Sequence, residues 1–222
     1  MIANKMPKTE PVPNWHLPKT EPVPNWCQHL AQNWHKGEIN LSKLKKITIA
    51  LVTILIIVLV AIGINKQMIK ILYKREYSEY VVKYSRENDV DQDLIYAIIK
   101  AESNFNASAI STSNAQGLMQ LMYSTAEDVA RKNGIELTKE NILNPEINIE
   151  IGTIYISTLL EKYGCLEIAL AAYNAGSGNV DKWISNGTIK KDGSDIENIP
   201  FKETNTYVRK ILRDYKIYQQ NN

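Results

Sequence analysis

A glutamate near the middle of the chain, Glu102, is the residue best placed for acid–base chemistry. It follows the apolar positions Leu94, Ile95, Ile98 and Ile99 and is the next position on the same helical face. A carboxyl group on such a face lies against a core or a cleft wall, where loss of water raises its pKa. A carboxyl that keeps its proton near neutral pH is what general-acid cleavage of a glycosidic bond requires.

Periodicity alone also allows Glu102 to lie at the edge of its helix and reach solvent, so other polar groups matter. The stretch Gly117-Leu118-Met119-Gln120 opens a second amphipathic run. Its glycine permits close backbone approach, Met119 offers a flexible wall, and the Gln120 amide can both donate and accept hydrogen bonds. Ordinary core packing is the alternative interpretation of Met119.

A third stretch, ALAAYNAGSG at 169–178, runs from small residues into Tyr173 and Asn174 and then into two glycines. Small residues allow close helix contact, and glycines end helices. The Tyr173 hydroxyl and the Asn174 amide would therefore lie at a helix end that faces a cleft. A helix stop with no role in ligand binding is the alternative.

The elements that must position these groups are helical. Asp91 is a good N-cap for the helix that carries Glu102, and the turn-prone residues 103–106 should end that helix. Apolar residues recur at steps of three and four through most of residues 76–222, and no long stretch alternates with a period of two. We expect residues 76–222 to form a mainly α domain that is large enough to bury a core.

An uncharged run of 18 residues, Ile47–Ile64, precedes this domain. As a helix it would rise roughly 27 Å, close to the bilayer hydrocarbon thickness of about 30 Å. We interpret residues 47–64 as a transmembrane helix and residues 65–75 as a basic linker suited to an anionic lipid surface. A buried soluble helix and a cleaved signal peptide fit less well. Lysines flank the run equally on both sides, so charge does not fix its orientation.

The first 46 residues carry an internal duplication, because PKTEPVPNW occurs at 7–15 and again at 18–26. Three prolines in nine residues oppose a helix, and we predict a disordered tail over residues 1–46. Its tryptophans could dock a partner, but we favour a recent duplication without selected structure as the explanation of the repeat. Cys27 and Cys165 are interpreted as free thiols. Cys27, His29 and His35 match no metal-ligand spacing, so no metal is expected.

Charge divides the chain into two parts. Residues 1–75 hold 11 basic and 3 acidic residues, a net charge of +8, whereas residues 76–222 carry −6. An acidic domain is a poor binder of nucleic acid, because phosphate contacts need Lys and Arg. Nothing in the composition implies an organic cofactor.

Taken together, the motifs resemble the soluble lytic transglycosylase family. Glu102-Ser103, then 117–120, then Ala172–Gly176 occur in that family's order and approximate spacing, and 144–152 and 203–208 resemble its later motifs. The resemblance covers residues 77–218 and implies a lysozyme-like fold.

The resemblance also implies a reaction and a site. Glu102 would be the single catalytic acid/base in cleavage of the bond between N-acetylmuramic acid and N-acetylglucosamine in peptidoglycan glycan strands, with a 1,6-anhydromuramic product and no metal or cofactor. Asp89, Asp91 and Asp93 are better explained as helix-capping and solvated charges than as a second catalytic carboxylate. The substrate-binding residues that the resemblance implies are Ser103, Met119, Gln120, Tyr173, Asn174 and Tyr207.

Location follows from that substrate. Peptidoglycan lies outside the bacterial cytoplasmic membrane, so the resemblance places residues 65–222 outside and the tail inside, on a single-pass membrane protein.

Two rival functions remain: a muramidase that hydrolyses the same bond with water, and an inactive membrane-tethered scaffold that binds glycan. Three positions depart from the family's usual residues: Asn114 and Tyr123, where glycine and proline are common, and Asn205, where arginine is common.

Overall fold

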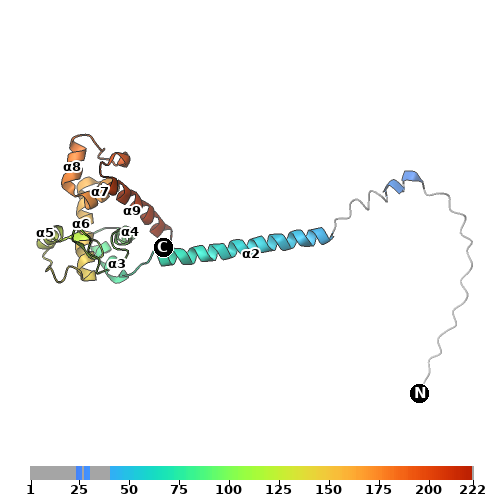
Figure 1. Ribbon diagram of the computed structural model, residues 1–222, viewed down its shortest axis with the longest axis horizontal. Helices are drawn as coiled ribbons and strands as arrows, with labels where there is room; N and C mark the ends of the chain where they lie inside the picture. The colour runs from blue at the N-terminus through green and yellow to red at the C-terminus, as the bar shows by residue number, and fades with distance from the viewer. Residues whose placement is uncertain (1–23, 27, 31–40, 222) are drawn as a thin grey trace, which may run out of the picture. The chain divides into compact units, whose positions relative to one another are not determined.

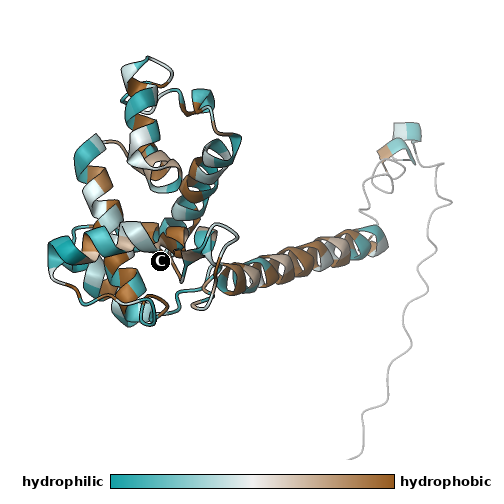
Figure 2. Ribbon diagram, turned by 60° about the vertical axis from the view of Figure 1, so that its left-hand side comes forward, coloured by the Kyte–Doolittle hydropathy of each residue, from teal (hydrophilic) through white to brown (hydrophobic). Residues whose placement is uncertain are grey.

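The computed structural model describes residues 24–26, 28–30 and 41–221, which belong to two units, Met1–Ile64 and Asn65–Asn222 (Figure 1). Helix α2 (Leu41–Leu72) crosses the boundary between them and has no buried residue. Its surface is apolar along most of its length (Figure 2). Among the described residues, α2 is the one helix that is long and apolar enough to cross a membrane.

Helix α2 is longer than the apolar run that predicted it. It begins at Leu41, inside the predicted tail, and its last residues, 65–72, occupy most of the predicted linker. Both extensions lack proline and glycine, and adding residues to an existing helix costs far less than starting one.

In the tail itself, Asn25, Trp26 and residues 28–30 are helical after Pro24, although we predicted disorder there. Proline suits the start of a helix. Cys27, His35 and the first proline repeat lie outside the described residues.

The globular domain is mainly helical, as predicted. Helix α4 carries Glu102 at its C-terminal end and packs against α9, which also packs against α7. Helix α6 packs against α3, α5 and α7. The bounds are α3 (Ser78–Glu87), α4 (Gln92–Glu102), β1 (Ala115–Gln116), β2 (Leu121–Met122), α5 (Tyr123–Asn133), α6 (Pro145–Tyr163), α7 (Leu166–Ala175), α8 (Ser177–Ser185), η1 (Ile196–Asn198) and α9 (Lys202–Gln220).

Helix α4 is more deeply buried than its apolar stripe indicated. The stripe residues are buried as expected, and so are Asp93, Tyr96 and Ala97 on its other faces. Asp91 caps the helix as predicted, since its Oδ1 accepts a hydrogen bond of 2.8 Å from the backbone N–H of Asp93. A helix enclosed on nearly every face holds its terminal residue, Glu102, in a fixed place.

The segment between α4 and α5 differs from the prediction. Residues 117–120 do not open an amphipathic helix but form the turn between β1 and β2, which pair antiparallel. Gly117 and Gln120 have φ values of 80° and 47°, in the left-handed region that an α-helix excludes. The helix therefore begins only at Tyr123.

A set of hydrogen bonds, here called the terminal clasp, joins the first residues of the domain to its last helix. The Tyr73 hydroxyl donates to Asp214 (3.1 Å), and the Arg75 guanidinium donates to the backbone carbonyl of Tyr218 (3.0 Å). The Tyr218 hydroxyl donates in turn to the carbonyl of Lys74 (2.9 Å). The Arg75 guanidinium also lies over the Tyr218 ring. The beginning and the end of the domain are thus fixed to each other.

Candidate active site

The Glu102 carboxyl group is held by a tyrosine from the other end of the domain. The hydroxyl of Tyr207, on α9, donates a hydrogen bond of 2.6 Å to Glu102 Oε1. Tyr207 is itself buried, and the packing of α4 on α9 brings the two residues together across 105 positions of sequence. One carboxylate oxygen is therefore engaged by Tyr207, and Oε2 remains for a ligand.

The surroundings of Glu102 favour its protonated form. Burial raises the pKa of Glu102 to about 7, against the opposing effects of the Tyr207 hydrogen bond and the positive charge of Lys210. The exposed carboxylate of Glu203 acts with burial and raises that pKa further. Near neutral pH this residue can both release and accept a proton, as predicted from its place on the apolar stripe.

Two more tyrosines complete a cluster with Tyr207. The Tyr173 hydroxyl donates to the backbone carbonyl of Met119 (2.9 Å), and the Tyr173 ring lies 5.1 Å from that of Tyr155. Burial raises the pKa of Tyr173 well above its usual value, and the negative charge of Glu102 adds to the rise. Tyr173, a predicted site residue, therefore lies near the acid, with Tyr155 beside it.

The predicted residues Ser103 and Met119 lie at the site as positioning groups. Ser103 caps the end of α4, and its hydroxyl lies 2.8 Å from the carbonyl of Leu118, to which it donates. Met119 is fully buried, so of the two interpretations offered for it, a flexible wall and ordinary core packing, the structure supports core packing. A Cβ added to Gly152 would collide with Met119 Sδ, so the missing side chain at 152 makes room for this packing.

Asn148, on α6, fixes the turn that carries Met119. This fully buried amide accepts a hydrogen bond of 2.8 Å from the backbone N–H of Met119. Its Nδ2 donates to the carbonyls of Gln116 (3.0 Å) and Ile142 (2.9 Å). A side chain at Gly117 would collide with the Asn148 amide. Two of these hydrogen bonds hold the segment of the turn to α6, and the third holds the loop that precedes α6.

A cavity of about 250 Å³ opens beside the tyrosine cluster. The predicted residues Gln120 and Asn174 line it. Gln120 Nε2 donates to the carbonyls of Ala109 and Gly117, and Asn174 Oδ1 accepts 2.7 Å from the Thr204 hydroxyl. These hydrogen bonds fix the orientation of the side-chain amides of Gln120 and Asn174. The cavity is lined by Gln120, Leu121, Met122, Thr125, Tyr155, Tyr173, Asn174, Ala175 and Gly176.

Sequence reasoning assigned no role to Tyr155, Asn148, Thr204, Glu203 or Lys210. Tyr155 was seen only as part of a helical periodicity, and an apolar stripe does not show which of its members reaches a cavity. The sequence did contain a signal for three of them, because stretches that resemble family motifs include Asn148, Glu203 and Thr204. In the part of the chain that the structure describes, no three His, Cys, Asp or Glu side chains gather as metal ligands would.

The three departures from the family's usual residues have local explanations. Asn114 has φ 61°, a conformation that asparagine tolerates better than other residues with a side chain. Tyr123 is the first residue of α5, where proline is favoured but not required. Asn205 donates to the carbonyl of Ile196 and accepts from Arg209 Nε (2.9 Å). None of these three residues forms a hydrogen bond with the Glu102 side chain.

Replacing Tyr207 with phenylalanine is expected to raise the pKa of Glu102. The substitution keeps the ring but removes the hydrogen bond that stabilises the carboxylate. Carbon-13 NMR titration of labelled glutamate carboxyl groups in the detergent-solubilised full chain measures the change. Tyr215→Phe is the control, because that hydroxyl donates to Asp91 (2.7 Å) instead. An unchanged or lower pKa in Tyr207→Phe would contradict the assignment.

Replacing Glu203 with glutamine is expected to shift the same pKa in the opposite direction. The change removes a negative charge that disfavours ionisation of Glu102, so the pKa of Glu102 should fall. The same titration measures it, with Glu87→Gln, an exposed glutamate at the end of α3, as the control. A pKa that stays at the wild-type value in Glu203→Gln would show that this charge does not act on Glu102.

Comparison with known proteins places this arrangement in context. Residues 79–196 match the family model described as the transglycosylase SLT domain. The soluble lytic murein transglycosylase of Salmonella typhimurium is 37% identical over 140 residues, which are 61% of this chain and 22% of that protein. The Escherichia coli K12 protein of the same name is 35% identical over 140 residues, with the same coverage. This chain thus spans about a fifth of the length of these relatives.

Solved structures agree with the sequence relatives. An inactive Glu-to-Gln mutant of the lytic transglycosylase Slt from Pseudomonas aeruginosa matches with a TM-score of 0.63 and 35% identity, over 68% of this chain and 25% of that chain. The 70 kDa soluble lytic transglycosylase of Escherichia coli matches with the same TM-score and coverage at 29% identity. The lysozyme-like, mainly α fold predicted from sequence is confirmed.

Proposed function

Because this chain belongs to the transglycosylase SLT domain family, we propose that its globular domain cleaves the glycan strands of peptidoglycan, with Glu102 as general acid and then as general base. The observation that carries the proposal is the pair Glu102–Tyr207. It combines a carboxyl group whose pKa is about 7 with a hydrogen bond that fixes its orientation, close to Tyr173, which lines the neighbouring cavity. The names of the relatives, murein transglycosylases, supply the substrate class.

In the first step, Glu102 acts as an acid. Because Tyr207 occupies Oε1, the proton resides on Oε2, and it passes to the oxygen that links N-acetylmuramic acid to N-acetylglucosamine. The bond from this oxygen to C1 of the muramic residue breaks as the proton arrives. The carbonyl oxygen of the muramic N-acetyl group bonds to C1 and stabilises the positive charge. This assistance from the substrate serves where most glycosidases use a second carboxylate.

In the second step, Glu102 acts as a base. Its carboxylate removes the proton from the 6-hydroxyl of the muramic residue, and that oxygen displaces the N-acetyl oxygen from C1. The product is a 1,6-anhydro sugar, no water is consumed, and Glu102 recovers its proton. The attacking group belongs to the same sugar, so the reaction gains from proximity. Since the first step needs the protonated form, activity should fall as the pH rises through about 7.

We further propose that α2 anchors the enzyme in the cytoplasmic membrane, with the domain on the outer side. The support is its length of 32 residues, its apolar surface and the lack of buried residues along it. A helix whose faces are all apolar is stable in lipid, whereas in water it would expose that surface at a large cost. The outward orientation rests on the location of the substrate.

Mass spectrometry of soluble products tests the function. The full chain in detergent is incubated with purified peptidoglycan, alongside Glu102→Gln. Anhydromuropeptides from the wild type and none from the variant are the expected result. Products one water heavier, with reducing ends, would identify a muramidase instead. If neither protein released products although both bound the wall, the chain would be a glycan-binding scaffold.

A further inference from the structure

A cavity of about 520 Å³ lies beside the terminal clasp and is here called the clasp pocket. Tyr73, Arg75 and Tyr218, which belong to the clasp, line it together with residues from the last turns of α2 and the end of α9. Its lining residues all belong to the unit Asn65–Asn222. The pocket shares no residue with the cavity beside the tyrosine cluster, so the proposed reaction gives it no role.

Two lysines, Lys66 and Lys70, make one side of the clasp pocket positive. Both are exposed and stand one helical turn apart, so they lie on the same face of α2. In the part of the chain that the structure describes, neither lysine forms an ion pair, and no residue that lines the pocket is acidic. The charge of Arg75 is already balanced, because its Nη1 lies 2.7 Å from Asp93 Oδ1. The two lysines therefore remain available to an anion.

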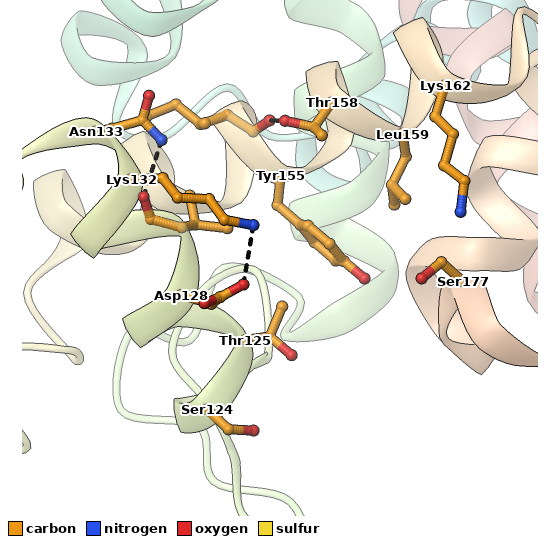
Figure 3. A pocket seen from close by; sticks show the side chains of 12 residues that line it. Ser124, Thr125, Asp128, Lys132, Asn133, Tyr155, Thr158, Leu159, Lys162 and Ser177 are labelled. Atoms are coloured by element: carbon orange, nitrogen blue, oxygen red, sulfur yellow. Dashed lines mark hydrogen bonds and ion pairs between the residues drawn. The ribbon is translucent and has the colours of Figure 1, made fainter.

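The cavity of about 420 Å³ between α5 and α6 differs in this respect (Figure 3). Both lysines that line it have carboxylate partners. Lys132 Nζ lies 3.0 Å from Asp128 Oδ2, the pair drawn in Figure 3, and Lys162 Nζ lies 2.7 Å from Asp181 Oδ2. Like charges one turn apart on a helix repel each other, and a bound anion relieves that repulsion. Of these two cavities, the clasp pocket is thus the one that favours a negative group.

Aromatic rings form the floor of the clasp pocket. The rings of Tyr73 and Tyr218 lie 5.3 Å apart, edge to face, and both hydroxyls are engaged within the clasp. The half-buried Ile69 adds apolar surface, and the exposed amides of Gln220 and Asn221 add hydrogen-bond donors. Tyrosine is enriched at membrane interfaces, because its ring has an apolar body and a polar end. A ligand that joins a negative group to an apolar part fits this lining.

The place of the two lysines along α2 matches the headgroup layer of a bilayer. They follow the apolar run 47–64 on one unbroken helix. At about 1.5 Å per residue, Lys66 and Lys70 lie roughly 3 Å and 9 Å beyond Ile64 along the helix axis. The headgroup layer on each side of the hydrocarbon is about 5–8 Å thick. With residues 47–64 in the hydrocarbon, both flexible side chains reach the lipid phosphates.

We propose that the clasp pocket binds the headgroup of an anionic phospholipid, with the phosphate between Lys66 and Lys70 and the glycerol against the tyrosine rings. The inference rests on the proposed insertion of α2 in the membrane, because only then does the pocket meet lipid. A bound headgroup contacts both α2 and α9, so it reinforces the clasp. Anionic lipid thereby stabilises the domain where the anchor joins it.

Titration with a short-chain, soluble lipid tests the pocket. Dihexanoyl phosphatidylglycerol is added to the isotope-labelled full chain in neutral detergent, and amide NMR shifts are followed at Ile69, Tyr73 and Gln220. In the double variant Lys66→Gln, Lys70→Gln, the apparent Kd should rise roughly 10–30-fold, because two cations that attract the phosphate are lost. The control double variant, Lys45→Gln and Lys46→Gln, removes the same charge from the other side of the apolar run and should keep the wild-type Kd.

Two comparison ligands identify the source of the anion. Dihexanoyl phosphatidylcholine and inorganic phosphate, at the same concentrations, should shift these amides much less. Equal shifts with phosphatidylcholine would make the pocket a general lipid contact, and equal shifts with phosphate would make it a site for free anions. Either result would overturn the proposal, and so would an unchanged Kd in the variant that lacks Lys66 and Lys70.

Membrane insertion and catalysis are measured separately. The full chain reconstituted in phosphatidylcholine vesicles should stay with them through an alkaline carbonate wash. Loss of the protein from the vesicles would refute the anchor and this inference with it, whereas retention without a preference for phosphatidylglycerol in the titration would overturn the inference alone. A chain that binds phosphatidylglycerol but cleaves no glycan would support the pocket and contradict the proposed reaction.

Discussion

Replacing Glu102 with glutamine in the full chain should lower kcat by roughly 10³–10⁴-fold with little change in KM. A single general acid contributes up to about 10⁴-fold, and here the same group serves both steps. Glutamine keeps the size of the side chain and can still accept from Tyr207, but it has no proton of suitable pKa to give. The measurement is the initial rate at which soluble muropeptides leave purified peptidoglycan.

The same variant has a stability signature that distinguishes lost chemistry from lost structure. The folded pKa of Glu102, about 7, lies above the usual value of 4.5, so the wild type loses stability as the pH rises through this window. Glutamine does not ionise. At pH 8.5 the variant should therefore be the more stable protein, by up to about 3 kcal/mol, and near pH 4 the two should agree. Glu87→Gln is the control for both measurements. Activity above a tenth of wild type would refute the role of Glu102.

Replacing Asn148 with alanine should cost about 4 kcal/mol of unfolding free energy, the largest stability change that we predict. The substitution removes the side-chain partner of two buried groups, the backbone N–H of Met119 and the carbonyl of Ile142, and of the half-buried carbonyl of Gln116. Each unsatisfied buried group costs roughly 1–3 kcal/mol. Because the turn also carries Gln120, activity should fall with stability. Urea denaturation of the full chain in detergent measures the first effect.

Two further variants serve as a comparison and a control for Asn148→Ala. Asn148→Asp keeps an oxygen that can accept from Met119, but it sets a buried carboxylate oxygen against the carbonyls of Gln116 and Ile142, so at neutral pH it should cost at least as much as alanine. Asn179→Ala removes an exposed amide that donates to the carbonyl of Ala175, and it should cost less than about 1 kcal/mol. A loss for Asn148→Ala no larger than that of Asn179→Ala would show that the turn holds itself without α6.

The sequence predicted those parts of the site that depend on local pattern. The stripe that ends at Glu102 is a property of one helix, and its burial followed from the spacing of four apolar residues. The partner of Glu102 could not be found in this way, because Tyr207 lies 105 residues away and meets it only through the packing of α4 on α9. Tyr207 was assigned to the site only because it lies in a stretch, 203–208, that resembles one of the family's later motifs.

The turn at 117–120 shows where local pattern failed. Its residues read as the start of an amphipathic helix, yet two of them adopt left-handed backbone conformations. The reason lies in α6. Asn148 accepts a hydrogen bond from the backbone N–H of Met119 and donates one to the carbonyl of Gln116, and Gly152 leaves space for the Met119 side chain. Tertiary contacts of this kind outweigh helix propensities of a few tenths of a kcal/mol per residue.

If α2 tethers the domain to a membrane, as proposed above, the terminal clasp determines where tension on that tether enters the domain. Tension on the tether reaches the domain through residues 73–75, whose bonds run to Asp214 and Tyr218 in the last turns of α9. The load does not stay on α9, because Arg75 also donates to Asp93 (2.7 Å) and Lys100 donates to Asp214 (3.0 Å), and both Asp93 and Lys100 lie on α4. Tension on the tether therefore reaches the helix that ends at Glu102 as well as the helix that carries Tyr207.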